Sequence, residues 1–136
     1  MRPASPAPSG RAAPPLARLR VLAGMSAKSP EAAARGLPNT LFAATIFHQG
    51  TLVGMGRVTG DGGLFFEIND IAVDPAHQKR GLGKAIVGSL MEYLRQVALP
   101  TAHVTLIADG EAHRLYAQFG FKAVEPDSIG MAFQIS

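Results

Sequence analysis

The chain has 136 residues, which suits one domain with a real hydrophobic core and is too short for two ordinary ones. It has no cysteine, which excludes a disulfide framework, a thiolate metal site and a cysteine nucleophile, and which is compatible with a reducing, cytoplasmic setting. No apolar run approaches the roughly 20 residues that cross a bilayer, so we expect a soluble protein without a membrane partner.

The net charge of +3 is unevenly distributed. Residues 1–30 hold five Lys or Arg and no acid, whereas residues 31–136 hold eight against ten Asp or Glu. A domain that neutralised many phosphates would need a basic face of its own, and this one is mildly acidic apart from residues 79–84. The sequence therefore disfavours nucleic acid as a partner.

Residues 1–15 form a distinct leader. Five of the ten prolines lie there, with Ala, Ser and Gly, and such a composition buries too little apolar surface to offset its ordering entropy. We expect this leader to be disordered, as a tail or the product of a wrongly chosen start codon, and the folded domain to span residues 16–136.

The first half of the domain predicts two short helices and three strands. A helix from Leu16 ends at Gly24 as its C-cap, and Ser29-Pro30-Glu31 begins a second helix that ends near Gly36. Apolar, β-branched runs then predict strands at 41–48, 51–59 and 64–73 in an antiparallel meander.

Two glycines, Gly54 and Gly56, interrupt the second of these strands. Glycine weakens a strand, and it commonly marks a bulge or a close approach of another backbone. We therefore expect one of these features in the second strand.

The second half predicts an amphipathic helix over 81–97, a buried strand over 103–108, a helix over 111–119 and two last strands at 121–124 and 131–135. The strand at 103–108 follows a helix and should run parallel to 64–73. The element order αα-βββ-α-β-α-ββ indicates the α/β class, with helices on the faces of a mixed sheet.

The stretch from Asn69 to Lys84 has the order of an anion site: a strand stops at a proline, passes through a basic, glycine-bearing loop and opens a helix. The first amides of a helix have no intrahelical partner, and the helix dipole is positive there. An ordinary connection with solvated lysines is the alternative at this level.

Spacing separates the known glycine loops. The pattern G-x-x-x-x-G-K-[ST] fails because position 78 is Gln and position 85 is Ala. A dinucleotide fingerprint fails because position 86 is Ile and a meander precedes the loop. Both interpretations of the loop as a nucleotide-binding site are therefore weakened.

The pattern Q-x-x-G-x-G at Gln78, Gly81 and Gly83 resembles the GCN5-related N-acetyltransferases, and Y-x-x-x-G-F from Tyr116 to Phe121 resembles that family's second landmark. The resemblance covers roughly residues 16–136 and implies the acyl-CoA N-acyltransferase fold. Family members usually begin with an edge strand, and the proline-rich leader stands in its place here, so we expect the first strand to be missing.

The resemblance implies acetyl-CoA as acyl donor, with no metal. A bulged strand would pair its backbone with the pantetheine arm and offer the Val73 amide to the oxyanion, while the loop amides hold the pyrophosphate. His113 and Asp109 are further candidates, although Asp109 stands where relatives often have Asn, so capping the next helix is its simpler role. The implied cofactor-binding residues are Ile71, Ala72, Val73, Gln78, Lys79, Arg80, Gly81, Leu82, Gly83, Lys84, Asp109 and His113.

The resemblance also implies direct attack by a primary amine, with Tyr116 as the general acid that protonates the departing thiolate. A phenol with an ordinary pKa near ~10 suits that role, and the alternative for Tyr116 is a packing residue. Glu67 is the first candidate base and Asp70 the second; either could instead be a solvated sheet residue, and Asp70 could hold a loop by hydrogen bonding.

The expected activity is an N-acetyltransferase acting on a small-molecule or peptide amine, and the resemblance allows a homodimer. A non-catalytic acyl-CoA-binding or regulatory domain is the alternative. The sequence does not identify the acceptor amine.

Overall fold

The computed structural model describes residues 13–136. They divide into two compact units, one ending at Leu106 and one running from Ile107 to Ser136, and each is described by itself. Most of the expected leader, residues 1–12, and the place of the missing first strand lie outside the described residues.

Two short helices come first, α1 (Ala13–Leu22) and α2 (Pro30–Gly36). Helix α1 begins earlier than expected because Pro14 occupies its first turn, where a missing N–H costs no hydrogen bond. Gly24, at a φ of +87°, ends it as predicted, and the Ser29 side chain caps α2 by accepting from the Ala32 N–H at 3.0 Å.

The first unit is built on a four-stranded sheet in the order β1-β2-β3-β4, with β1 (Phe42–His48), β2 (Thr51–Gly60), β3 (Phe65–Val73) and β4 (His103–Thr105). The first three strands are antiparallel and β4 is parallel to β3, as predicted. Gln49 and Gly50 both have positive φ in the β1–β2 turn, the geometry that suits a tight hairpin.

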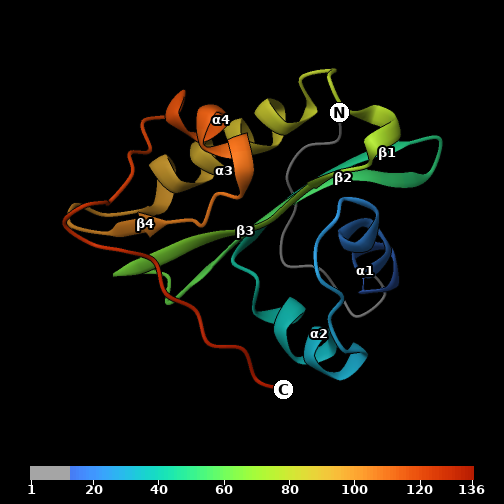
Figure 1. Cartoon of the computed structure of the whole chain (residues 1–136), viewed down its shortest axis with the longest axis horizontal. Coiled ribbons are helices and arrows are strands. Elements are labelled where there is room, and N and C mark those ends of the chain that lie inside the picture. The colour runs from blue at the N-terminus through green and yellow to red at the C-terminus, as the bar shows by residue number, and fades with distance from the viewer. Residues whose placement is uncertain (1–12) are drawn as a thin grey trace. The chain divides into compact units, whose positions relative to one another are not determined.

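Helix α3 (Leu82–Val97) lies on one face of the sheet, and α1 and α2 lie on the other (Figure 1). The apolar stripe of α3 is buried on the sheet through Ile86, Val87, Leu90 and Leu94. On the opposite face, Leu16 and Leu19 of α1 join one buried cluster with side chains of β2 and β3. The sheet is therefore the middle layer of the first unit.

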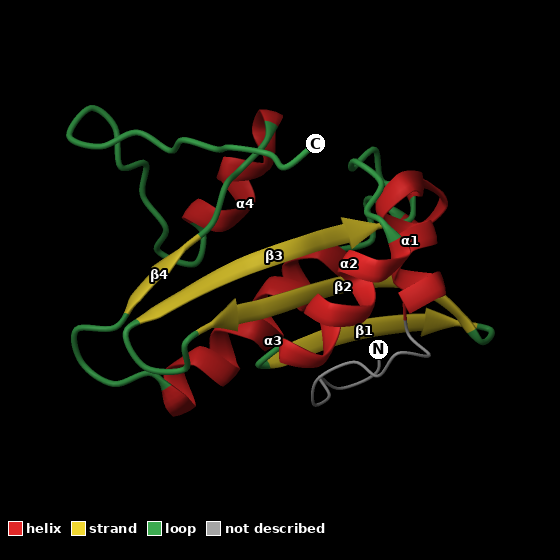
Figure 2. Ribbon diagram, turned by 90° about the horizontal axis from the view of Figure 1, so that it is seen from below, coloured by secondary structure: helices red, strands yellow, loops and turns green. Residues whose placement is uncertain are grey.

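Strand β4 is shorter than expected and pairs with β3 at only three positions, Phe65 to Glu67 against His103 to Thr105. Figure 2 shows β4 beside the beginning of β3 alone. Beyond Glu67, the outer edge of β3 has no strand partner among the described residues. We call the unpaired outer edge of β3 beyond Glu67 the free edge.

The second unit contains a 3-10 turn, η4 (Gly110–Ala112), and one short helix, α4 (His113–Ala117). The strands expected at 121–124 and 131–135 are absent from it, and that expectation was wrong. A strand needs a neighbour for its backbone groups, and in residues 122–136 one backbone bond, from Ser128 N–H to Val124 O, closes a local turn. Met131 and Phe133 are accordingly each 88% exposed.

Candidate active site

A bulge interrupts β3 opposite Gly56, in the strand where the resemblance implied one. Met55 pairs with Ala72 and Arg57 with Asn69, so Asp70 and Ile71 together stand opposite the single residue Gly56. Asp70 has a φ of +59°, the left-handed conformation found at the first position of one common bulge type. The predicted bulge is confirmed.

The bulge leads into a backbone edge of β3 that no strand covers within residues 13–136. The Asp74 N–H donates to Val53 O at 2.8 Å, in the same register that places Val73 opposite Gly54. Because hydrogen-bonded and non-bonded pairs alternate in an antiparallel ladder, the N–H and C=O of Val73 point away from β2. They face the edge that β4 leaves uncovered.

The loop after β3 is held by its own side chains. Asp74 caps the 3-10 turn η3 (Pro75–His77) by accepting from the Ala76 N–H at 2.9 Å. The Gln78 side chain donates from Nε2 to Val73 O at 3.2 Å, which ties the loop back to the end of the strand. Gln78 thus fixes the position of the loop relative to the end of β3.

The same loop ends in an open, positively charged helix terminus. Lys79 and Gly81 both have positive φ, at +64° and +76°, and Gly81 is the N-cap of α3 without a side-chain capping bond. The amides that follow it, on Leu82, Gly83 and Lys84, therefore lack a cap. No atom lies within 4 Å of the place where a Cβ on Gly81 would stand, so a ligand could approach the backbone there.

Exposed cations flank this terminus: Lys79, Arg80 and Lys84. Arg80 approaches the ring of His77, with 3.5 Å between its Nη1 and Nδ1 of His77. The full charges, the uncapped amides and the positive end of the α3 dipole all attract an anion. The arrangement can bind a phosphate or pyrophosphate.

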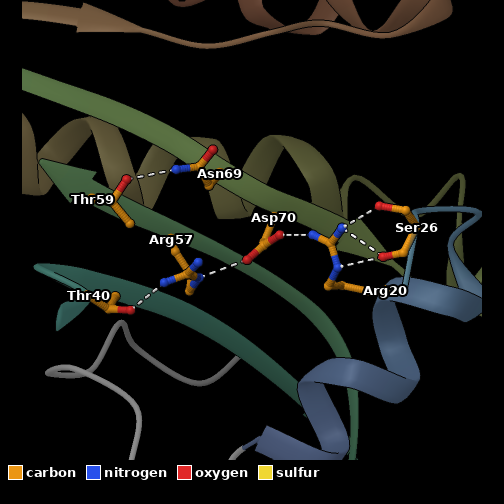
Figure 3. Close-up of polar contacts among 7 residues, drawn as sticks. All are labelled: Arg20, Ser26, Thr40, Arg57, Thr59, Asn69 and Asp70. Atoms are coloured by element: carbon orange, nitrogen blue, oxygen red, sulfur yellow. Dashed lines mark hydrogen bonds and ion pairs between the residues drawn. The ribbon is translucent and has the colours of Figure 1, made fainter. Parts of the chain in front are cut away.

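The two candidate bases on β3 have different surroundings. Glu67 is exposed, opposite Thr59 on β2 and Thr105 on β4. Asp70 is only 13% exposed and accepts from two guanidinium groups, on Arg20 of α1 and Arg57 of β2 (Figure 3). The structure thus favours Glu67 as a free carboxylate and gives Asp70 the alternative role, that of holding its surroundings by hydrogen bonds.

Sequence reasoning missed Arg20 and Arg57. The available signal was a charged residue inside an apolar strand, between Gly56 and Val58, and another on α1 directly after the buried Leu19. Buried cations require anionic partners. Nothing local in the sequence pairs these cations with Asp70, which is 50 residues from Arg20.

In the second unit Tyr116 is buried at 7% exposure on α4, and its ring meets Phe121 edge to face at 6.3 Å between centroids. Burial raises the pKa of the Tyr116 phenol, and the negative charge of Asp109 raises it further. Tyr116 therefore keeps its proton at neutral pH. The raised pKa also makes this phenol a weaker acid than an ordinary tyrosine.

His113 and Asp109 flank the 3-10 turn η4. Nδ1 of His113 donates to Gly110 O at 3.1 Å, which fixes the tautomer of the ring and leaves Nε2 as acceptor when the ring is neutral. Asp109 stands at the N-cap of η4 but makes no capping bond, so the expected capping role was wrong.

The fold is the one found in the acyl-CoA N-acyltransferases. Over 99% of this chain and 100% of the other, it superposes with a TM-score of 0.89 and 43% identity on SA2161 from meticillin-resistant Staphylococcus aureus, a probable acetyltransferase. Rv2747 of Mycobacterium tuberculosis, solved in complex with CoA and NLQ, has the same fold at a TM-score of 0.71 and 21% identity, over 91% of this chain and 74% of that one.

The Acetyltransferase (GNAT) family matches residues 19–121, and the chain belongs to this family. Histone acetyltransferase TAP1 of Glycine max is 38% identical over 81 residues, which are 60% of this chain and 34% of the soybean protein. The chloroplastic GCN5-related N-acetyltransferase 2 of Arabidopsis thaliana is 38% identical over 78 residues, 57% of this chain and 29% of that protein. The chain thus spans about a third of the length of these curated relatives.

Within residues 13–136, the helices are all too short or too polar to cross a membrane.

Proposed function

We propose that this protein transfers the acetyl group of acetyl-CoA to a primary amine. The observation that carries the proposal is the outward-pointing backbone of Val73, which is followed within one loop by the uncapped, basic N-terminus of α3. A pantetheine arm carries amides that pair with such an edge, and the pyrophosphate beyond it suits the helix terminus.

The residues at these places fit the donor. The Cβ space at Gly81 is open, the first α3 amides lack a cap, and three exposed cations stand beside them. The donor supplies an activated thioester. The N–H of Val73 is the group of this chain that we assign to the oxyanion, because it lies on the uncovered edge of β3.

In the transfer, the amine nitrogen forms a bond to the acetyl carbon and the carbon–sulfur bond breaks. The electron pair of that bond leaves with the sulfur, and the phenol of Tyr116 gives the sulfur its proton. The amine loses a proton to Glu67, directly or through water, because the exposed Glu67 carboxylate is free to accept it. His113 and Asp109, which flank the turn before α4, are assigned to the donor side.

Calorimetry with acetyl-CoA, with ATP and NAD as controls, tests the donor. We expect heat with acetyl-CoA alone, and a loss of affinity of about tenfold in the Arg80→Gln, Lys84→Gln double variant. Lys28→Gln is the matched control, because Lys28 is an exposed cation outside the loop. No heat with acetyl-CoA would overturn the proposal.

A panel of primary amines, followed by release of free thiol from acetyl-CoA, tests the chemistry. We expect thiol release to depend on the amine and to fall by about 100-fold or more when Tyr116 is replaced by Phe. Binding of acetyl-CoA without thiol release from any amine would instead indicate a non-catalytic acyl-CoA-binding domain.

A further inference from the structure

The carboxylate of Asp70 is shared between two elements that are far apart in the sequence. Arg20, near the end of α1, donates from Nη1 to Oδ1, and Arg57 on β2 donates from Nε to Oδ2 at 2.8 Å (Figure 3). All three side chains are poorly exposed, at 11%, 15% and 13% for Arg20, Arg57 and Asp70. Both carboxylate oxygens are therefore already used.

The two guanidinium groups are themselves anchored. Arg20 also donates from Nε and Nη2 to Ser26 O, at 3.1 and 2.8 Å, in the loop after α1. Arg57 donates from Nη1 to the hydroxyl of Thr40 at 2.6 Å, and Thr40 is 4% exposed just before β1. Asp70 is thus the centre of a network that joins α1, the loop after it, the start of β1, and β2 to β3.

The backbone at Asp70 is in an uncommon conformation. Its φ of +59° lies in the left-handed region, which residues other than glycine rarely adopt and which Asp and Asn tolerate best. Asp70 is also the residue at which the register of β3 shifts against β2. Ile71, Ala72 and Val73, the free edge of β3, follow it directly.

The electrostatics reinforce this constraint. Two cations share one carboxylate, so the network carries one excess positive charge in a poorly exposed place. Removing the carboxylate would leave two guanidinium groups facing one another without an anion, and the β3 bulge would lose its only side-chain tie to α1 among the described contacts.

We propose that Asp70 is a positioning residue for acyl transfer. Through Arg20 and Arg57 it holds the bulge in one conformation, and so it sets the direction of the Ile71–Val73 backbone edge. The inference rests on the function proposed above, because the edge matters only if it binds the acyl donor. It assigns to Asp70 a role other than that of a base.

The test uses variants that separate backbone conformation from charge. Asn and Gly both tolerate positive φ, so Asp70→Asn and Asp70→Gly preserve the bulge conformation locally and remove the anion. We expect both variants to lose between about 10- and 100-fold in kcat/KM, mostly through a raised KM and Kd for acetyl-CoA, with an unchanged shape of the pH profile. A base would behave oppositely, with a lowered kcat, an unchanged Kd and a lost acidic limb, and that result would overturn the inference.

Arg57→Gln is the second variant, and it covers the case in which the Asp70 variants fail to fold. It leaves the one-to-one pair of Arg20 and Asp70, and we expect an intermediate loss that Arg57→Lys partly restores. If the network acts as a unit, the Asp70→Asn, Arg57→Gln double variant loses less than the two single losses combined. Wild-type kinetics in Arg57→Gln, or strictly additive losses, would contradict the proposal.

Hydrogen exchange separates this inference from the proposed function. The amides of Ala72 and Asp74 point toward β2, where the Asp74 N–H donates to Val53 O at 2.8 Å, and they should exchange faster in Asp70→Asn, or in Arg57→Gln, than in the wild type, whatever the ligand. A wild type that binds no acetyl-CoA defeats the proposed function but leaves this measurement intact. Equal exchange in wild type and variants would defeat the positioning role even if the enzyme is active.

Discussion

Gly56 on β2 lies so close to Ile71 on β3 that a Cβ on Gly56 would stand 2.6 Å from Cδ1 of Ile71. The same Cβ would lie 2.6 Å from Cγ2 of Ile86 and 3.1 Å from Cδ1 of Leu90, both fully buried on α3. Real Cβ atoms do not approach this closely, so α3 rests on the sheet at a point where only glycine fits.

Replacing Gly56 by Ala should therefore destabilise the protein by about 1–3 kcal/mol, because a buried helix or the bulge must shift to admit the methyl group. Denaturation by urea measures the change. Gly63→Ala is the matched control, since its nearest neighbour would be 4.0 Å away and its backbone conformation suits any residue. Equal stability of the two variants would contradict the close approach.

Asp61 fixes the turn that begins β3. Its Oδ1 accepts from the N–H groups of Gly63, Leu64 and Phe65, at 2.9, 2.8 and 3.1 Å, and these bonds lower the pKa of its carboxyl, with the bond from Phe65 contributing most. A depressed pKa in the folded state contributes stability above the ordinary value near ~3.9, and that contribution is lost as the pH falls through the folded value.

Asp61→Asn should accordingly be less stable than the wild type at pH 7, and the difference should shrink as the pH falls below 4. Urea midpoints at pH 7 and pH 3 measure this, with Asp127→Asn in the exposed C-terminal segment as the control. A difference that stays constant with pH would show that the charge of Asp61 does not matter to the turn.

Gly81 offers a test of the pyrophosphate site that leaves folding intact. Asn tolerates a φ of +76°, and a Cβ on Gly81 would meet nothing within 4 Å beyond its chain neighbours, so Gly81→Asn should change the free energy of unfolding by less than about 1 kcal/mol. The added side chain should nevertheless raise the Kd for acetyl-CoA by more than about tenfold, because it occupies the space through which a phosphate reaches the amides.

Gly62→Asn is the control for this experiment, because Gly62 has a φ of +82° and equally open surroundings in a different turn. Calorimetry on both variants should show a loss of affinity for Gly81→Asn alone. Unchanged affinity in Gly81→Asn would remove this loop from the donor site.

Glu67→Gln tests the proposed base. The side chain is exposed, so stability should change by no more than about 0.5 kcal/mol. We expect kcat to fall by about 100-fold or more with an unchanged Kd for acetyl-CoA, the signature of a lost proton acceptor. Glu92→Gln, an exposed carboxylate on α3, is the control, and normal turnover in Glu67→Gln would assign deprotonation of the amine to water alone.

The strand, loop and helix from Asn69 to Lys84 could be predicted from sequence because their determinants are local. Gly81 permits a positive φ, Pro75 ends the strand, and the apolar stripe of α3 repeats at helical spacing. The bulge was also accessible, because a glycine inside a buried strand indicates a bulge or a close approach, and Gly56 lies at both.

The network around Asp70 was not accessible, because Arg20 lies 50 residues from it and pairs with it only after the sheet and α1 have packed. The expected strand at 131–135 failed for the opposite reason. Apolar side chains occupy every second position at Met131, Phe133 and Ile135, which is the pattern of a strand. A strand also needs a neighbouring strand to pair with its backbone N–H and C=O groups, and this pattern does not supply one. Local sequence patterns therefore predicted the loop. They did not predict the Asp70 network or the missing strand, because both depend on residues far away in the sequence.

Tyr116→Phe tests the general acid, and its pH dependence has a definite sign. The pKa of Tyr116 is raised, by burial first and by Asp109 second, so the folded protein holds the proton to a higher pH than an ordinary phenol near ~10. This contribution to stability is fully present below the ordinary value and is lost as the pH rises through the folded value. Below pH 9 the wild type should therefore keep a constant share of protonated phenol.

Turnover in Tyr116→Phe should fall by about 100-fold or more at pH 7, because the thiolate then leaves without a positioned proton. The alkaline decline of kcat that Tyr116 imposes on the wild type should vanish in the variant, and Asp109→Asn should move that decline to lower pH by removing the nearby negative charge. Tyr93→Phe is the matched control, since Tyr93 stacks on Phe42 at 4.3 Å, on the first unit. A Tyr116→Phe enzyme with the turnover of Tyr93→Phe would leave Tyr116 a packing residue against Phe121.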